Sequence, residues 1–334
     1  MSGVIDQILE SRGIKNAEKH LAFCNPNYDL NGYDAFLLPD MAKAVNRLMQ
    51  AKNNNESVYI YGDYDIDGLT ATAILLDAFK KFGLRCDAYI PNRFTDGYGL
   101  SNGAIKTLSK EGAQLIVTVD CGSLSHEEIE LANRLGLDVI VTDHHSVSKT
   151  MPPAIAVINP KRPDHNYPFT DLAGCGVAFK LVQALQTRLE GLDAGQEKWL
   201  LDLVAFGTVC DVVTLLDENR TNVFWGLQVL KKTRRPGLKA ILHVTGVDLN
   251  RINSRTLGFV IGPHLNAAGR LETAKHSLDL LLEEDPLRAL EIANKLHSMN
   301  SERRQIQDRI FKEACEQAEK LSDDPVLVLS GKKW

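Results

Sequence analysis

Long apolar runs, paired cysteines and a positive net charge are all missing from this sequence of 334 residues. No stretch approaches the ~20 consecutive apolar residues of a membrane-spanning helix. The first residues also lack the basic start and apolar core of a secretory signal peptide. We therefore expect a cytoplasmic protein without membrane contact. The six cysteines include no C-x-x-C pair, which argues against a zinc ribbon and against a disulfide framework.

Aromatic residues are few, at 7% of the chain, and the net charge is −5. Neither value by itself favours nucleic-acid binding, for which basic surfaces and stacking aromatics are typical. Acids gathered around bound cations would inflate the negative total, however, so the local arrangement of charge is more informative. With 44% hydrophobic and 24% charged residues, the composition is otherwise that of an ordinary globular protein.

What the sequence does contain is a set of short acidic motifs, each preceded by apolar residues. They are DYDIDG at Asp63–Gly68, VDCGS around Asp120, TDHH ending at His145 and GTVCDV around Asp211. Oxygen-rich ligands with one or two imidazoles suit Mn²⁺ or Mg²⁺ better than structural Zn²⁺. Two such ions ~3.5–4 Å apart clamp the attacking and leaving oxygens of a phosphoryl group, so the pattern predicts phosphodiester hydrolysis. The carboxylates and imidazoles of this expected two-metal site are Asp65, Asp67, Asp120, Asp211, His144 and His145.

Strand-like and helical segments alternate from residue 57 onward, which predicts βαβ units and a parallel sheet. Asp63, Asp120 and Asp143 each follow an expected strand, and open α/β sheets bind ligands beyond the carboxyl ends of their strands. One such Asp usually caps the next helix, but three of them with tandem histidines favour a metal centre. Strands are expected at 58–62, 86–90, 114–119, 138–142 and 155–158, and helices between them at 69–82, 102–111 and 125–135.

The later part of the chain is expected to be helical. Asp285 should cap a long helix that has Pro286 at its first position. The middle of that helix is polar on nearly every face, which is typical of a connector that crosses solvent. A strand at 325–329 would then begin a second domain that is largely missing. The expected organisation is a helical lead-in at 1–55, an α/β domain at 56–284 with a helical part at 172–284, a connector helix at 285–322 and the start of the second domain at 323–334.

Together these motifs resemble the catalytic core of the RecJ single-strand-specific exonucleases in the DHH phosphoesterase superfamily. The resemblance begins at Phe36 and rests on nine runs in a fixed order: YGDYDIDGLTATA, RFTDGYGLS, TVDCGS, TDHH, INPKRPD, LAGCGVAFKL, GTVCDVVTL, IGPHLNAAGRL and LVLSG. It implies a 5′→3′ exonuclease on single-stranded DNA that uses Mn²⁺ or Mg²⁺ and acts in DNA repair and recombination. A single-strand-binding protein or a helicase is the candidate partner that it suggests.

The resemblance also implies a ligand set by motif position. Asp65 and Asp67 would ligate the two ions, and Asp120 would bridge them. His144 and Asp211 would complete the shell. In-line displacement at phosphorus needs little from the protein beyond metal geometry and positive charge on the phosphate, so these implied roles agree with the chemistry expected from the residues themselves.

Substrate contacts are implied in the same way. His145 would contact the scissile phosphate. Arg93, Asn266 and Arg270 would hold phosphate oxygens. Asp63 would have a supporting role only, in which it orients the metal ligands or the water.

Two departures from the family pattern stand out. His264 occupies a place where the family usually has arginine, which predicts a weakened or pH-dependent cationic contact. The family also continues beyond LVLSG into a DHH-associated domain, often followed by an OB-fold, and we expect this sequence to lack both. Because the DHH-associated domain forms one wall of the family's DNA groove, the activity of 1–334 alone is left open.

Other functions also stay open at this point. A DHH phosphodiesterase for oligonucleotides or cyclic dinucleotides is one, although those enzymes lack a helical insert such as 172–283. An inorganic pyrophosphatase needs histidine four residues before the first metal aspartate, where this chain has Tyr61. A non-catalytic DNA-binding scaffold would have lost metal ligands, which this chain keeps, and an inactive fragment is the remaining alternative.

Overall fold

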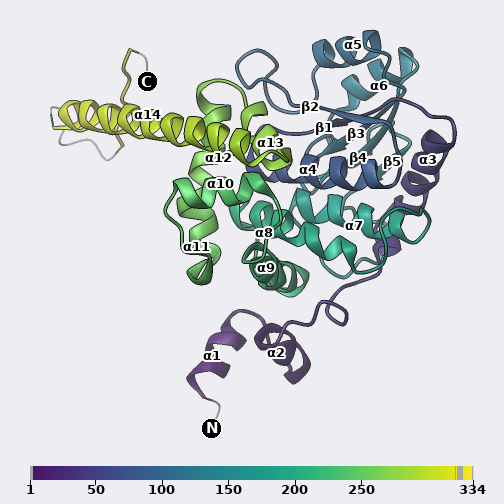
Figure 1. Cartoon of the computed structure of the whole chain (residues 1–334), viewed down its shortest axis with the longest axis horizontal. Coiled ribbons are helices and arrows are strands. Elements are labelled where there is room, and N and C mark those ends of the chain that lie inside the picture. Colours follow the sequence, from purple (N-terminus) through teal and green to yellow (C-terminus); the bar gives the residue numbers. More distant parts are fainter. Residues whose placement is uncertain (1–2, 320, 322–325, 333) are drawn as a thin grey trace.

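The computed structural model describes residues 3–319, 321, 326–332 and 334. At its centre is a five-stranded, all-parallel sheet in the order β2-β1-β3-β4-β5 (Figure 1). The predicted α/β fold with a parallel sheet is confirmed, and each strand matches its expected range to within one residue. The strands are β1 (Val58–Tyr61), β2 (Cys86–Tyr89), β3 (Leu115–Val119), β4 (Asp138–Thr142) and β5 (Ala156–Ile158).

Both faces of the sheet are buried, because side chains alternate along each strand. In β3, Val117 and Val119 face the larger hydrophobic core, whereas Ile116 faces the smaller one. Continuous β-branched runs such as LIVTV are what a parallel sheet needs when helices cover both of its sides. The larger core includes α3 (Met41–Asn53), α4 (Ile66–Lys81) and α7 (Gly174–Gln186), and the smaller one includes α5 (Asn102–Lys110) and α6 (His126–Arg134) (Figure 1).

The direction of chain progression reverses between β1 and β3. β2 lies on one side of β1, and β3 to β5 follow on the other side. Such a reversal opens a crevice beyond the carboxyl ends of the two central strands, which is where open α/β folds bind ligands. Asp63 follows β1 after one intervening residue and Asp120 follows β3 directly, so both carboxylates come to this crevice.

Helix α4 begins three residues earlier than its expected start at residue 69. The carboxylate of Asp65 accepts hydrogen bonds from the backbone N–H groups of Asp67 and Gly68, at 2.9 and 3.1 Å. An N-cap of this kind accepts hydrogen bonds from the first backbone N–H groups of the helix, which have no partner within the helix. The helix therefore starts inside the acidic motif, and Asp67 stands in its first turn.

The chain from residue 172 to residue 284 forms a group of helices beside the sheet. α8 packs against α4, α7 and α9, which explains why its sequence is apolar on every side. The domain boundaries drawn from the sequence stay a prediction. The helices are α8 (Leu201–Cys210), α9 (Asp217–Leu230), α10 (Pro236–Val244), α11 (Ser254–Thr256), a π-helical segment (Leu257–Ile261), α12 (Gly262–Leu271) and α13 (Lys275–Leu282).

The two ends of the chain lie away from the sheet (Figure 1). α1 (Val4–Ser11) and α2 (Ala17–Cys24) form the N-terminal part, and α2 contacts α9. α14 (Pro286–Ala318) is one long helix, capped by Asp285 as expected. Its first half packs on α10, α12 and α13, and the remainder extends outward. None of the helices in the described ranges is both long and apolar enough to cross a membrane.

The strand expected at 325–329 is wrong for the residues that the structure describes. Residues 326–329 form no strand, and residue 325 lies outside the described residues. Val326 and Val328 are 77% and 90% exposed. A β-strand needs a hydrogen-bonding neighbour, and the five strands of the described sheet offer none here. That this segment begins a second domain stays a prediction.

Candidate metal centre

The turn between β1 and α4 supplies the acids of the first motif. The carboxylate of Asp67 accepts hydrogen bonds from the backbone N–H groups of Gly174 and Cys175, at 2.5 and 2.9 Å. These two groups are the first of α7, and a helix N-terminus favours negative charge. The LAGCG run therefore positions a carboxylate that lies more than a hundred residues earlier in the sequence.

Asp120 has a backbone conformation that is rare for a residue other than glycine. Its φ is +60°, in the left-handed region, and its N–H donates to the carbonyl of Thr142 at 3.0 Å. Backbone strain of this kind persists where the surroundings enforce it, and functional sites are common examples. The surroundings here are tight, since a Cβ on Gly174 would lie 2.7 Å from Oδ1 of Asp120.

His144, at the end of β4, brings the separate motifs together. Its Nε2 lies 3.0 Å from Oδ1 of Asp120, 3.6 Å from Oδ2 of Asp211 and 3.8 Å from Oδ2 of Asp67. Asp211 arrives from the C-terminus of α8 rather than from a strand. Three groups of potential ligand atoms result, and within each group the atoms lie within 4.8 Å of one another: Asp67, His144 and Asp211; Asp63, Asp65 and Asp120; and Asp120, His144 and His145.

The polar atoms of this cluster are buried without partners. Across the described part of the chain, eight buried side-chain atoms lack a hydrogen-bond partner, and five of them are here: Oδ1 of Asp63, Oδ1 of Asp120, Oδ2 of Asp211 and both ring nitrogens of His144. Leaving buried polar groups unpaired is costly. Cations between these atoms would remove that cost, and the donor set of oxygens and imidazole fits Mn²⁺ or Mg²⁺.

The charges of the cluster lead to the same conclusion. Burial, followed by the neighbouring carboxylates, raises the pKa of Asp63 to about 7 and that of Asp211 to about 7. The pKa of Asp120 is raised well above its ordinary value for the same reasons. Carboxylates this close repel one another when ionised. Divalent cations would offset both the burial and the repulsion.

Asp143 is expected from the sequence at the same sheet edge as Asp63 and Asp120, but the sequence analysis assigns it no role of its own. It accepts hydrogen bonds from Nδ1 of His145 at 2.8 Å and from the backbone N–H groups of His144, His145 and Ser123 at 2.7 to 3.1 Å. Although burial opposes ionisation, these bonds, with that from His145 foremost, lower the pKa of Asp143 to about 2. The bond to Asp143 raises the pKa of His145. Its position at a strand end, directly before two histidines, was the sequence signal that could have identified this role.

That bond also orients the His145 ring. Because Asp143 can only accept, Nδ1 of His145 carries the hydrogen, and Nε2 faces the hydroxyl of Tyr98 at 3.2 Å. The side chain of His145 is 45% exposed, whereas that of His144 is only 6% exposed. The two neighbouring imidazoles therefore differ: one is buried among carboxylates, and the other reaches solvent.

Arg93 and the end of α12 meet at the same turn. The guanidinium of Arg93 lies 5.4 Å from the ring centroid of Tyr64, which stands between two acids of the first motif. Asn92, beside Arg93, donates from Nδ2 to the carbonyl of Glu272 at 3.4 Å. A Cβ on Gly269 would lie 3.1 Å from the Tyr64 carbonyl. The arginine loop and α12 thus share one rim of the metal cluster.

Asn266 and Arg270 line a small pocket together with Cys210, the residue before Asp211. Each residue expected at the site is therefore either in the cluster or on its rim. His264, for which the sequence predicts a weakened or pH-dependent cationic contact, is not among the residues that line this pocket. It is 5% exposed, and its ring nitrogens lie 2.7 Å from the Val260 carbonyl and 3.2 Å from His297. Burial lowers its pKa, so it offers no cationic contact to a phosphate.

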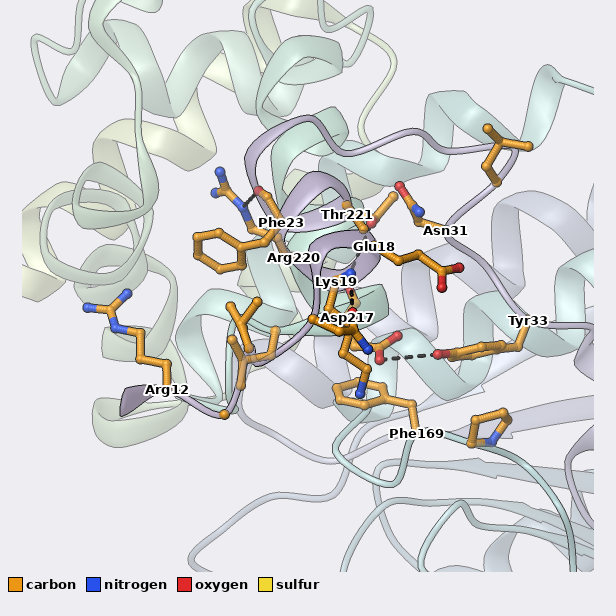
Figure 2. Close-up of a pocket in the computed structure, with 17 residues that line it drawn as sticks. Arg12, Glu18, Lys19, Phe23, Asn31, Tyr33, Phe169, Asp217, Arg220 and Thr221 are labelled. Carbon is orange, nitrogen blue, oxygen red and sulfur yellow. Dashed lines mark hydrogen bonds between the residues drawn. The ribbon is translucent and has the colours of Figure 1, made fainter. Parts of the chain in front are cut away.

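A larger pocket of about 430 Å³ lies elsewhere, between the N-terminal segment and α9 (Figure 2). There the hydroxyl of Tyr33 donates to Asp217 at 3.1 Å. Cations such as Arg12 and Lys19 alternate with acids such as Glu18 in its lining, so no single charge dominates. No residue expected to bind metal or phosphate lines this pocket.

Comparison with known proteins places the chain in a family. A family model described as the DHH family, N-terminal domain, matches residues 57–208. The single-stranded-DNA-specific exonuclease RecJ of Bacillus subtilis (strain 168) is 39% identical over 332 residues, which are 99% of this chain and 41% of that protein. A crystal structure of exonuclease RecJ bound to manganese is 34% identical with a TM-score of 0.76, and the match covers 84% of this chain and 70% of that one. The chain belongs to the RecJ family.

A second RecJ structure, the Mn²⁺ complex from Thermus thermophilus, agrees closely. It is 31% identical with a TM-score of 0.78 over 93% of this chain and 43% of the other. The resemblance drawn from the motifs is thus confirmed. The chain spans between 41% and 57% of the length of the curated RecJ relatives that it matches.

Proposed function

We propose that this RecJ-family chain is a metal-dependent exonuclease that hydrolyses single-stranded DNA from its 5′ end. The observation that carries the proposal is the group of buried, unpaired carboxylates and imidazoles at the switch point of the sheet. It is supported by curated relatives that are named single-stranded-DNA-specific exonucleases, and by RecJ structures that contain Mn²⁺ or Mg²⁺.

Two ions are proposed, because the ligand atoms fall into groups that share members. Asp65, Asp67, His144 and Asp211 would hold them, and Asp120 would serve both, because it shares one group with Asp65 and another with His144. When bound, such ions supply charge neutralisation at the phosphate and an activated water. Asp63 would support the cluster from the end of β1. Single-metal occupancy with Asp120 uninvolved would contradict this arrangement.

The remaining chemistry belongs to side chains of the rim. In its doubly protonated form, which the hydrogen bond to Asp143 favours by raising the pKa of His145, His145 would donate from Nε2 to an oxygen of the scissile phosphate, where negative charge grows in the transition state. Arg93 and Arg270 carry planar guanidinium groups that can bind a phosphate through two parallel hydrogen bonds. Asn266 would add an amide donor beside Arg270. Arg93 and Arg270 are exposed, and His145 and Asn266 are partly exposed.

DNA is proposed to cross this rim as a single strand. On the Arg93 loop, Phe94 and Tyr98 are 66% and 57% exposed, and exposed aromatic rings of this kind stack on unpaired bases. Repair and recombination are the processes in which such an activity would act. A single-strand-binding protein or a helicase is the partner that we propose for it.

The test is degradation of one single strand carrying a label at either end, with Mn²⁺, with Mg²⁺ and with a chelator. Cleavage from the 5′ end should release a 5′ label as a mononucleotide and leave a ladder of shortening fragments with a 3′ label. A duplex of the same sequence is the control and should resist. Hydrolysis that starts at the 3′ end, or that persists with the chelator, would contradict the proposal.

A further inference from the structure

The pocket beside the metal cluster combines residues from four segments: the end of α8, the turn that leads into α12, α12 itself, and α14. Its volume is about 200 Å³, below the ~300–1,000 Å³ typical of sites for drug-sized ligands. A single phosphate group suits that volume better than a whole nucleoside. The turn before α12 is π-helical, a distortion frequent at functional sites. The lining includes Cys210, Gly258, Gly262, Asn266, Arg270 and Arg303.

Two guanidinium groups enter this pocket from different helices, Arg270 from α12 and Arg303 from α14. They are close enough that Arg270, after burial, lowers the pKa of Arg303. Within the described residues, neither side chain has a carboxylate at ion-pair distance. Arg303 instead donates to the amide oxygens of Asn300 and Gln307, at 3.1 and 2.9 Å. Two guanidinium groups that lie close together without a carboxylate between them form a binding site for an anion.

The pocket opens next to the metal cluster. Cys210, which lines the pocket, directly precedes Asp211 of the cluster at the end of α8. A Cβ on Gly262 would lie 3.0 Å from the Cys210 sulfur. Glycine at this position therefore lets the start of α12 come against the end of α8. An anion in the pocket would be a neighbour of the cluster and not a distant ligand.

A pair of stacked histidines fixes the position of α14 relative to α12. His264 and His297 have ring centroids 5.2 Å apart and an interplanar angle of 14°. Because the Val260 carbonyl can only accept, Nδ1 of His264 carries a hydrogen. Nε2 of neutral His264 then accepts from Nδ1 of His297 at 3.2 Å. Arg303 follows His297 by less than two helical turns, so this contact sets where its guanidinium lies relative to Arg270.

We propose that this pocket is a phosphate subsite, in which Arg270 and Arg303 together hold one backbone phosphate of the substrate strand beside the scissile one. α14 would then be part of the binding site as well as a connector. The inference rests on the proposed function, since it takes the strand to run through the metal cluster. The ligand class is a phosphate diester or monoester within an oligonucleotide.

The first experiment compares two arginines on the same helix. Arg309 is exposed, lies outside the pocket and pairs with Glu313 at 3.7 Å. Binding of a fluorescent single strand is measured in Ca²⁺, over a range of salt. Arg303→Gln should weaken binding about tenfold, the value of one charged hydrogen bond, and should lower the salt slope by about one. Arg309→Gln should stay within about twofold of wild type. Equal effects of the two substitutions would overturn the subsite.

A second experiment locates the contacted phosphate. Single strands are prepared with one uncharged methylphosphonate linkage at each position in turn. For the wild type, a methylphosphonate at one position near the 5′ end should weaken binding as much as Arg303→Gln weakens binding of the unmodified strand. For the variant, that same linkage should cause no further loss. If the variant responds to every linkage as the wild type does, Arg303 has only a structural effect and the subsite is refuted.

Controls separate this inference from the proposed function. Melting temperature and Mn²⁺ binding of Arg303→Gln should equal those of wild type, and Arg303→Lys should give an intermediate affinity, because it keeps the charge without the planar fork. Hydrolysis is measured separately with Mn²⁺. Selective binding without any hydrolysis would overturn the exonuclease and leave the subsite standing. If the wild type hydrolyses the strand but Arg303→Gln binds it as tightly as wild type, the subsite is overturned and the exonuclease stands.

Discussion

Nε2 of His144 lies 3.0 Å from Oδ1 of Asp120, yet neither atom is hydrogen-bonded. The imidazole comes from the end of β4 and the carboxylate from the end of β3, so parallel strand pairing brings the two groups to the same edge. Two buried polar atoms at this distance without a hydrogen bond are arranged to share a third partner. A divalent cation is the partner that fits both.

Asp120→Asn should strongly reduce hydrolysis while the fold survives. Asparagine keeps the shape and tolerates the φ of +60° that Asp120 adopts, but it removes the charge that two ions would share. We expect a loss of about 10²–10³-fold in turnover, as for other groups that stabilise transition-state charge. The melting temperature without metal should be equal or higher, since repulsion among the acids falls. Near-wild-type turnover would show that Asp120 does not bridge.

Stability of the metal-free protein should fall as pH rises from about 4 to about 7. Unfolded aspartates ionise near ~3.9, whereas the folded pKa of Asp63 and of Asp211 is about 7. In that window the folded state holds more protons, so the free energy of unfolding decreases with pH. Mn²⁺ needs ionised ligands, so its upward shift of the melting temperature should be larger at pH 8 than at pH 5.

The control for this pH dependence is Asp211→Asn, which removes one of the titrating groups. The difference in melting temperature between the variant and the wild type, both without metal, should grow in favour of the variant as pH rises. A difference that is constant across the window would mean that this carboxylate ionises normally in the folded protein. An equal Mn²⁺ shift at both pH values would contradict the ligand assignment.

The two neighbouring histidines should respond differently to metal. His144 lies among the carboxylates, whereas His145 is oriented by Asp143 and reaches solvent. His144→Ala should weaken Mn²⁺ binding, and excess Mn²⁺ should restore part of the activity. His145→Ala should bind Mn²⁺ like wild type and stay inactive at any Mn²⁺ concentration. Both are measured as activity against Mn²⁺ concentration, and equal rescue of the two would show that the roles are wrongly divided.

Strand ends were predictable because the length of each apolar run determines where a buried strand must stop. Asp63 and Asp120 could therefore be placed at one sheet edge from the sequence alone. Asp211 could not be placed at that edge, because it arrives at the end of a helix, although its acidic motif marked it as a potential ligand. Nothing local in the sequence relates Arg303 to Arg270, since that contact depends on how α14 crosses α12. The segment 326–329 has strand propensity but no neighbouring strand among the described residues.

Asp143→Asn should reduce turnover without releasing metal. Asp143 touches His145 and backbone N–H groups, and it belongs to none of the three groups of potential ligands. An asparagine oxygen can still accept from Nδ1 of His145, but its amide group would then face the Ser123 N–H, donor against donor. The ring would lose both its orientation and the negative charge behind it. Substitutions of groups that orient a functional side chain typically cost about 10–100-fold.

The measurement is turnover at saturating Mn²⁺, together with the Mn²⁺ dissociation constant. A matched control is Asp87→Asn, the same substitution at an exposed position on β2, which should change neither value. If Asp143→Asn lowers Mn²⁺ affinity as much as His144→Ala does, Asp143 supports the metal ligands and not the His145 ring. If turnover is unchanged, the hydrogen bond of 2.8 Å to His145 has no part in the reaction. Reduced turnover at unchanged affinity is the one result that follows from His145 acting on the phosphate and Asp143 acting through His145.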